Sequence, residues 1–438
     1  MKKNIRELAL SVLIEWEAQD KYVNLALDAH YLDTLSPSER GALTALVYTA
    51  VEHKLTYDYI ISALAARELS RLDPHTVNIL RLGLCQIIHM NSIPDFAAVN
   101  ETVKLARSSG ERSIVNGILR RAAREKDHLP EPDKNKNYSR YLSVKYSFPL
   151  KLVKHFDSLL GREDTERILD YFNNVKYTDL TVNTTRISVE DYILLLSDAG
   201  YKAERNLDTG THIRIDRSVN PENLPGFSEG YFLVQDRASF TAVAALAPKE
   251  KDILVDCCAC PGGKSFAAAI LMGDTGEIHS LDLHESKLSL IAGGAERLGL
   301  RSVIPDCHDG EEPREDLIGR ADKVICDVPC SGLGVLGKKP DLRYNAENTM
   351  DALPPLQLRI LNAAAKYLRV DGEMIYSTCT VNPEENERVV EAFLSASPDY
   401  APVEFTVGAL ESENGMLQML PHVHKADGFF ICKLTRIR

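Results

Sequence analysis

The sequence contains no uninterrupted apolar stretch of the ~20 residues that a membrane-spanning helix needs. Its first apolar run is broken by Glu15 and Glu17, too early for the apolar core of a secretory signal peptide. A hydrophobic content of 44% and a charged content of 26% are typical of a soluble globular protein. We therefore expect a cytoplasmic protein with no membrane partner.

The sequence also lacks any Cys-x-x-Cys pair, although it contains nine cysteines. No histidine recurs at a spacing suited to a metal ligand. An odd number of thiols scattered over a long acidic chain is not typical of the disulfide framework of a secreted protein. We expect no metal site.

An excess of positive charge is missing as well, since the net charge is −12. This value argues weakly against a nucleic-acid partner. Residues 1 to 130, however, carry 16 Lys and Arg against 16 Asp and Glu, and residues 104 to 126 hold seven bases and two acids. On a helix, Asn116 and Arg120 would share one face and Arg121 would lie on a neighbouring one. This basic stretch could bind phosphates, or it could be merely a solvated helix face.

With 438 residues, the chain is too long for one ordinary domain. Residues 1–126 repeat apolar positions at helical spacing, and Pro37, Pro74 and Pro94 mark helix starts, which predicts an all-helical bundle. Residues 127–139 are rich in Pro, Asn and charge and are interpreted as a linker. Residues 140–224 are expected to form a small α/β module, with a helix at 189–199, strands at 180–184 and 212–215, and a possible RNA contact surface. In residues 225–438, strands alternate with helices, which is typical of a parallel, doubly wound sheet.

Two apolar strands of this last region end at thiols. One runs through Ile325 and Cys326 to Asp327, Pro329 and Cys330, and the other ends at Cys379, 49 residues after Cys330. Open α/β sheets bind ligands at the carboxyl ends of their strands, so neighbouring strands would bring both sulfurs to one site. Cysteines are also common in protein cores, and the residues alone do not say which thiol would be the nucleophile.

A Gly-rich loop follows the first strand of the same region. The strand 253–258 leads into Pro261-Gly262-Gly263-Lys264 and then a helix, where the backbone can approach a ligand closely. A phosphate-binding loop is the alternative, but the Walker spacing is not met. Asp282 ends the next strand, where an acid can bind a ribose hydroxyl or simply cap the helix 285–298. Asp309 follows the third strand and could contact an adenine edge or form a turn.

Taken together, the Pro-Gly-Gly-Lys loop, Asp282 and the two thiol-bearing strand ends resemble the RNA (cytosine-5) methyltransferases that use S-adenosylmethionine. The segments 93–101 and 114–121 resemble the RNA-binding helical domain of the antitermination factor NusB. The combination is similar to the RsmB/Sun group of small-subunit ribosomal RNA methyltransferases, over nearly the whole chain and most strongly from Gln235 to Glu387. The resemblance implies a NusB-like bundle, a small α/β module and a Rossmann-like catalytic domain, in a monomer whose partner is 16S ribosomal RNA.

The resemblance also implies roles for individual residues. Cys379 would attack carbon 6 of a cytidine so that carbon 5 can be methylated, Cys330 would help to release the product, and Asp327 would serve the cofactor or the base. The implied cofactor residues are Cys258, Ala259, Cys260, Pro261, Gly262, Gly263, Lys264, Asp282, Asp309 and Asp327. Family members often have Ala in place of Cys260 and Val328. A transfer-RNA methyltransferase and a non-catalytic RNA-binding transcription or assembly factor are the alternatives.

Two further segments flank these strand ends. Lys338, Lys339 and Arg343 lie just beyond the Cys330 loop and would suit a flipped-out RNA base and its phosphates, unless they only form a solvated loop. Residues 383–387 are interpreted as an acidic first turn of a helix, which the helix dipole favours.

Overall fold

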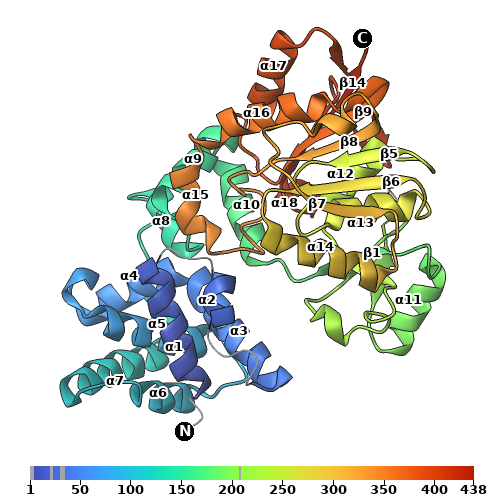
Figure 1. Ribbon diagram of the computed structural model, residues 1–438. Coiled ribbons are helices and arrows are strands. Elements are labelled where there is room, and N and C mark those ends of the chain that lie inside the picture. Colours follow the sequence, from blue (N-terminus) through green and yellow to red (C-terminus); the bar gives the residue numbers. More distant parts are fainter. Residues whose placement is uncertain (1–3, 20–22, 30–34, 207–208) are drawn as a thin grey trace. The chain divides into compact units, whose positions relative to one another are not determined.

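The computed structural model describes residues 4–19, 23–29, 35–206 and 209–438 (Figure 1). The chain forms two compact units. The first comprises Met1–Asn173 together with Leu336–Glu347, and the second comprises Asn174–Val335 together with Asn348–Arg438. A short segment from the second half of the sequence therefore belongs to the N-terminal unit.

The first unit is helical, as predicted. Its helices are α1 (Ile5–Gln19), α2 (Val23–Ala29), α3 (Pro37–Glu52), α4 (Lys54–Ala65), α5 (Pro74–His89), α6 (Asp95–Val103), α7 (Ser109–Arg124), α8 (Tyr138–Lys145), α9 (Leu150–Leu160) and α10 (Arg162–Asn173). The predicted helix starts are confirmed. Ser36 and Glu39 form a reciprocal capping box at α3, and the Asp73 side chain accepts from the His75 backbone N–H at α5.

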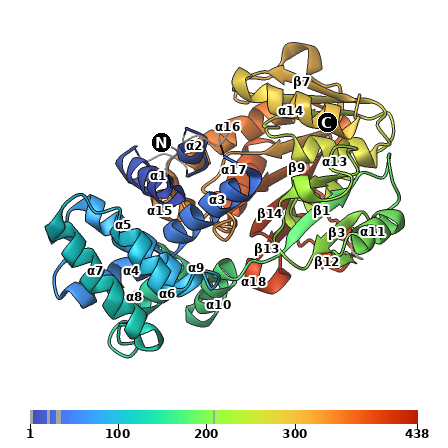
Figure 2. The ribbon, with the colours of Figure 1, turned by 90° about the horizontal axis from the view of Figure 1, so that it is seen from below.

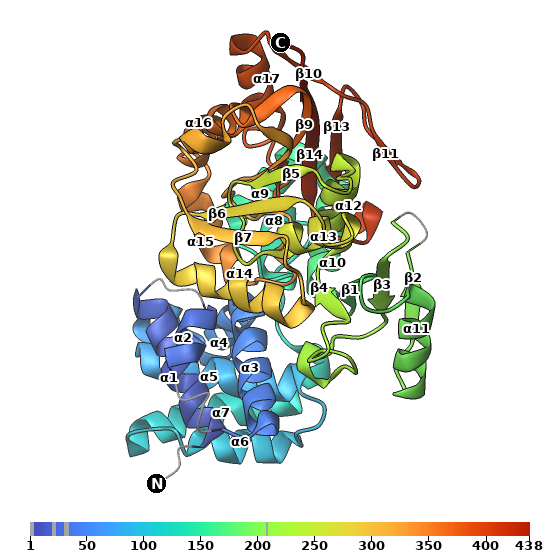
Figure 3. The ribbon, with the colours of Figure 1, turned by 45° about the vertical axis from the view of Figure 1, so that its right-hand side comes forward.

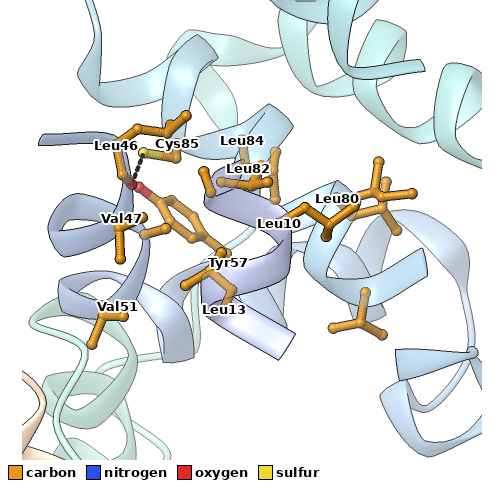
Figure 4. Close-up of a cluster of buried hydrophobic side chains, with 14 of the residues drawn as sticks. Leu10, Leu13, Leu46, Val47, Val51, Tyr57, Leu80, Leu82, Leu84 and Cys85 are labelled. Carbon is orange, nitrogen blue, oxygen red and sulfur yellow. Dashed lines mark hydrogen bonds between the residues drawn. The ribbon is translucent and has the colours of Figure 1, made fainter. Parts of the chain in front are cut away.

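Helix α5 lies at the centre of this unit. Its residues from His75 to Ile87 are buried, which is expected of a helix surrounded by others. Figure 4 shows Leu80, Leu82 and Leu84 of α5 in one cluster with Tyr57 of α4. The apolar positions recognised in the sequence thus form the core of the bundle.

A small antiparallel sheet opens the second unit (Figures 2 and 3). Its strands are β1 (Thr178–Val182), β2 (Ala203–Arg205), β3 (His212–Ile215) and β4 (Phe232–Val234), in the order β2-β3-β1-β4. Helix α11 (Val189–Asp198) packs on it through Tyr192 and Leu196. The predicted helix 189–199 and the two predicted strands are confirmed. Residues 140–224 are divided between the units, because α8 to α10 belong to the first.

The large sheet has the order β10-β14-β9-β8-β5-β6-β7, with β13 paired to β14. Its strands are β5 (Ile253–Asp256), β6 (Glu277–Asp282), β7 (Val303–Cys307), β8 (Ala321–Asp327), β9 (Leu368–Thr378), β10 (Tyr400–Pro402), β13 (Met416–Met419) and β14 (Phe429–Arg436). The run from β9 to β7 is parallel, as predicted. Strands β14, β10 and β13 extend it antiparallel, which the sequence pattern did not predict.

Helices cover both faces of the large sheet (Figure 1). Leu254, Ile325 and Ile375 pack with α12 (Arg237–Leu246), α13 (Gly263–Leu271) and α14 (Glu285–Leu298). The alternate residues Val324 and Tyr376 face α16 (Leu353–Ala365) and α17 (Glu387–Ala396). This alternation follows from strand geometry and leaves the strand ends as the open edge for a site.

Four short elements remain, three in the C-terminal part of the second unit and one helix that begins in the segment Leu336–Glu347 of the first unit. They are β11 (Thr406–Val407), β12 (Leu410–Glu411), α18 (Pro421–His424) and α15 (Leu342–Thr349). In the described part of the chain, no helix has the length and apolar character to cross a membrane.

Candidate active site

The two predicted thiols meet at the ends of adjacent strands. Strands β8 and β9 are parallel neighbours, and Asp327 lies opposite Ser377 at the end of their ladder. Just beyond it, the sulfurs of Cys330 and Cys379 lie 3.1 Å apart, and both residues are partly buried. The prediction that the strands are neighbours with both sulfurs at one site is confirmed.

The environment of the thiol pair makes the two sulfurs unequal. The hydrogen bond to Cys379, burial, and the negative charge of Glu385 raise the pKa of Cys330 well above its ordinary value. The raised pKa favours the protonated form of Cys330, which can act as the donor in this hydrogen bond.

Asp327 and Lys264 form an ion pair beside the thiols. The Lys264 Nζ donates to Asp327 Oδ2 at 2.6 Å, and the Ser377 hydroxyl donates to Oδ1 at 2.7 Å. Burial by itself would lower the pKa of Lys264, but the neighbouring Asp327, Asp256 and Cys379 raise it overall. Both oxygens of Asp327 thus accept hydrogen bonds, as an ionised carboxylate does, and a cation is held close to Cys379. Nothing in the sequence indicated that the Ser377 hydroxyl would bind Asp327.

The Gly-rich loop leads from β5 into α13, which confirms the predicted order of strand, loop and helix. Gly262 has φ of +107°, and a Cβ atom on it would lie 2.3 Å from the ring of Phe266, so only glycine fits. Asp282 accepts from the backbone N–H of Cys260 at 3.2 Å and from that of His284 at 3.0 Å. The cap residue of α14 is His284, so Asp282 does not cap this helix but ties the Gly-rich loop to the end of β6.

Further acids lie at the same ends of neighbouring strands. Asp256, at the end of β5, is buried and accepts from the Ser265 hydroxyl at 2.7 Å, while its second oxygen has no protein partner. Burial raises the pKa of Asp256 to about 7. Asp309 is exposed and accepts from the Glu311 N–H at 3.0 Å, which forms a turn. With Asp282 and Asp327, these acids and the open glycine loop could hold a cationic adenosyl cofactor.

The interpretation of residues 383–387 as an acidic first helical turn is confirmed only for Glu387 and is wrong for residues 383–386. Helix α17 begins only at Glu387, and Glu385 is fully buried. Its carboxylate accepts from both the backbone N–H and the hydroxyl of Ser331, the residue after Cys330. The attraction of acids to a helix start suggested the first interpretation, whereas the buried donors decide where this side chain lies.

The candidate RNA contacts divide into exposed and buried residues. Arg120 and Arg121 are exposed on α7, where Arg120 donates to Asn116 at 2.8 Å, which confirms that these two share a face. Lys338 and Lys339 are exposed as well. Arg343 is instead fully buried in the first unit, and its guanidinium donates to backbone carbonyls and lies 3.9 Å from the centre of the Phe148 ring. The prediction of Arg343 as a surface RNA contact is therefore wrong in this structure.

Comparison with known proteins covers the chain from end to end. The family model of the 16S rRNA methyltransferase RsmB/F matches residues 243–435, the NusB family model matches residues 3–124, and a ferredoxin-like domain model of RsmF/B-like methyltransferases matches residues 148–222.

Individual relatives match over similar lengths. The chain is 36% identical to the "Probable ribosomal RNA small subunit methyltransferase B" of Synechocystis sp., over 98% of this chain and 99% of that protein. It is 33% identical to the protein of the same name from Bacillus subtilis, over 99% of both. A crystal structure of a methyltransferase homolog from Pyrococcus horikoshii is 27% identical over 67% of this chain and 97% of that one, with a TM-score of 0.58.

The three family models together cover most of the helical unit, the small sheet and the large sheet. With identities above 30% over almost the full length, the chain belongs to the RsmB/F family of 16S rRNA methyltransferases.

Proposed function

We propose that this enzyme methylates carbon 5 of a cytidine in 16S ribosomal RNA through a covalent bond between Cys379 and carbon 6 of the base. The observation that carries the proposal is the pair of sulfurs 3.1 Å apart at the ends of two parallel strands. Carbon 5 of cytosine is a poor nucleophile, and addition of a thiolate to carbon 6 makes it enamine-like and reactive.

The thiol pair supports a division of labour. The family resemblance assigns the attack to the sulfur of Cys379, and the raised pKa of Cys330, which favours its thiol form, agrees with that assignment. Once Cys379 is bonded to carbon 6, its sulfur is a neutral thioether that no longer stabilises the protonated form of Cys330. Cys330 would then lose its proton to solvent, and its thiolate, or a water that it positions, would accept the proton that leaves methylated carbon 5; the electron pair of that C–H bond re-forms the double bond between carbons 5 and 6 and expels Cys379 as a thiolate.

Lys264 and Asp327 supply the electrostatics of the site. A thiol needs a nearby positive charge to be a useful nucleophile at neutral pH, and the Lys264 ammonium is that charge here. Asp327 orients Lys264 as a hydrogen-bonded carboxylate, and the pair can stabilise negative charge that develops on the base when the thiolate adds.

The methyl donor that we propose is S-adenosylmethionine, which supplies a methyl group on a positively charged sulfur. The loop from Cys258 to Lys264 would hold it, with the carboxylates of Asp282, Asp309 and Asp327. The glycine geometry at Gly262 and the unpartnered oxygen of Asp256 support a ligand at this edge.

The proposed RNA contacts are Arg120 and Arg121 on α7 and Lys338 and Lys339 in the segment after the Cys330 loop. All four side chains are exposed and basic, as phosphate contacts require. A cytoplasmic location and a monomeric state stay predictions from the sequence.

Two cysteine variants test the chemistry with unmodified 16S rRNA and labelled S-adenosylmethionine. Cys379→Ala should abolish methylation while leaving cofactor binding intact. Cys330→Ala should accumulate a protein–RNA complex that resists denaturant and migrates slowly on a gel. Normal turnover of Cys379→Ala would disprove the nucleophile assignment, and the absence of a complex with Cys330→Ala would remove the role in product release. Cys307→Ala, at an exposed cysteine, is the matched control.

The modified nucleotide can be located by bisulfite mapping of RNA from cells that lack the protein. A single cytidine of 16S rRNA should lose its protection from conversion. Loss of protection in transfer RNA instead would favour a transfer-RNA methyltransferase, and unchanged protection in all RNA would favour a non-catalytic RNA-binding factor.

A further inference from the structure

Glu385 is a buried side chain whose carboxylate accepts four hydrogen bonds, all from neutral groups. The Ser331 N–H donates to Oε2 at 2.8 Å and the Gln357 amide to the same oxygen at 3.0 Å. The Ser331 hydroxyl and the Asn382 amide, the latter at 3.0 Å, donate to Oε1. Burial of a carboxylate is costly even when it is well hydrogen-bonded, so this arrangement calls for an explanation beyond stability.

The donors come from three elements that surround the two thiols. Ser331 follows Cys330 in the loop after β8, and Asn382 lies three residues after Cys379 in the loop after β9. Gln357 projects from α16 and also donates to the Pro329 carbonyl at 2.9 Å. A single carboxylate therefore joins both thiol-bearing loops to each other and to a helix.

The backbone ladder does not extend over these loops. Pairing of β8 with β9 ends at Asp327 and Ser377, before either thiol is reached. Beyond it, the Val328 N–H donates to the Ser377 carbonyl at 3.2 Å, the Gly334 N–H donates to the Cys379 carbonyl at 3.0 Å, and the hydroxyls of Ser331 and Thr380 share a hydrogen bond at 2.9 Å. The two bonds from Ser331 to Glu385 are thus among the few contacts that set the separation of the two sulfurs, and they are the ones that involve a charged side chain.

Charge gives Glu385 a second effect on the thiols. Cys330 faces Cys379 and Glu385, and the ion pair between Lys264 of α13 and Asp327 at the end of β8 lies at the same edge of the sheet. The carboxylate of Glu385 adds to the hydrogen bond with Cys379 and to burial in raising the pKa of Cys330. A neutral side chain at position 385 would weaken this preference for the protonated form.

We propose that Glu385 is a positioning residue that holds Cys330 beside Cys379, so that product release, and not bond formation, depends most on it. This proposal rests on the proposed two-thiol reaction. Glu385 does not touch the reacting atoms; it acts through Ser331 and Asn382 on the loops that carry the two sulfurs.

The test compares Glu385→Gln with Glu384→Gln, whose side chain is adjacent and exposed. In Glu385→Gln, an amide NH₂ replaces one acceptor oxygen and would face other donors. The two thiol-bearing loops should therefore shift relative to each other. We expect turnover on unmodified 16S rRNA to fall by about 10²-fold, as an error of about 1 Å in placement can cause. We also expect the denaturant-resistant complex with RNA to accumulate, as with Cys330→Ala. Equal turnover and equal complex in the two Gln variants would overturn the proposal.

A second readout needs neither RNA nor turnover. Alkylation by iodoacetamide is followed at each thiol by peptide mass across pH, and Cys330 in Glu385→Gln should react at lower pH relative to Cys379 than in the wild type. Removal of the Glu385 charge and separation of the two sulfurs would both lower the pKa of Cys330, whereas a general loosening of the protein would make both thiols more reactive together. Unshifted profiles in folded protein would therefore also overturn the proposal.

A milder variant guards against misfolding of Glu385→Gln. Ser331→Ala removes one hydroxyl donor but keeps the backbone N–H, Gln357 and Asn382 bonds, and should show the same changes to a smaller extent. If Cys330→Ala traps no complex, the two-thiol reaction fails, while the alkylation profiles still decide whether Glu385 positions Cys330. If Cys330→Ala traps a complex and both Glu385→Gln and Ser331→Ala behave like Glu384→Gln, only the role of Glu385 fails.

Discussion

Asp256 illustrates how burial changes one residue at the edge of the site. It is enclosed at the end of β5, where only one oxygen accepts from a protein side chain, the Ser265 hydroxyl. Burial raises its pKa from 3.8 to about 7, so the folded protein prefers the neutral acid. The same residue in the sequence is simply an acid at a strand end.

This shift predicts a dependence of stability on pH. Because the folded pKa is the higher one, the stabilising contribution of protonated Asp256 is complete below pH ~4 and is lost as pH rises through ~7. Between pH 5 and pH 8 the wild type should lose about 2 to 3 kcal/mol that Asp256→Asn does not lose. Urea unfolding of the full chain, followed by circular dichroism, measures this difference. Asp309→Asn, at an exposed acid, should track the wild type, and a parallel pH response of Asp256→Asn would contradict the prediction.

At the scale of elements, the segment Leu336–Glu347 packs within the helical unit although it follows the Cys330 loop in sequence. The Asp341 carboxylate accepts from the Val23 N–H at 3.1 Å, and the Tyr344 hydroxyl donates to the Val51 carbonyl at 2.9 Å. The Tyr344 ring also meets Trp16 edge to face at 5.5 Å. The helical unit is therefore completed by residues that the sequence places in the catalytic region.

Arg343 should be the main stabilising side chain of this segment. It donates to the carbonyls of Leu336, Glu52 and Tyr146, and Arg343→Ala would remove these hydrogen bonds and leave a cavity. We expect a loss of about 3 to 5 kcal/mol in the stability of the helical unit. Trp16 is the single tryptophan, so its fluorescence reports urea unfolding of this unit.

Lys339→Ala is the control for this prediction because Lys339 is an exposed residue of the same segment. It should change stability by no more than about 0.5 kcal/mol. Equal unfolding midpoints for the two variants would show that the buried guanidinium contributes little.

At the scale of the whole molecule, the N-terminal part differs from the rest in net charge. The net charge is −12, yet residues 1 to 130 are neutral and contain the basic helix α7. An acidic protein can still bind RNA if bases are concentrated on one face, because phosphate contacts act locally at physiological salt.

Replacing both Arg120 and Arg121 by Glu should weaken RNA binding and reduce its salt dependence. If each arginine contacts one phosphate, the slope of log affinity against log salt should fall by about 2. This slope is obtained by measuring the affinity for 16S rRNA at a series of salt concentrations. Arg388→Glu, an exposed position on α17 that pairs with Glu391, should leave the slope almost unchanged. An unaltered slope in the α7 variant would leave this helix without a role in RNA binding.

The sequence by itself determined the helical bundle, the parallel strands and the strand-end residues Asp327, Cys330 and Cys379. These follow from local signals: apolar periodicity, proline and serine at helix starts, and glycine where the backbone must turn. Such signals need only neighbours in sequence. Strands β13 and β14 escaped prediction because antiparallel edge pairing depends on which distant strand lies beside them.

Only the tertiary structure decided how polar side chains are used. Lys264 pairs with Asp327, 63 residues away, and Glu385 bonds to Ser331, 54 residues away. Arg343 and Glu385 looked like surface charges in sequence but are fully buried. The reason is physical: a charged side chain can be buried wherever enough partners surround it, and those partners come from segments that only folding brings together.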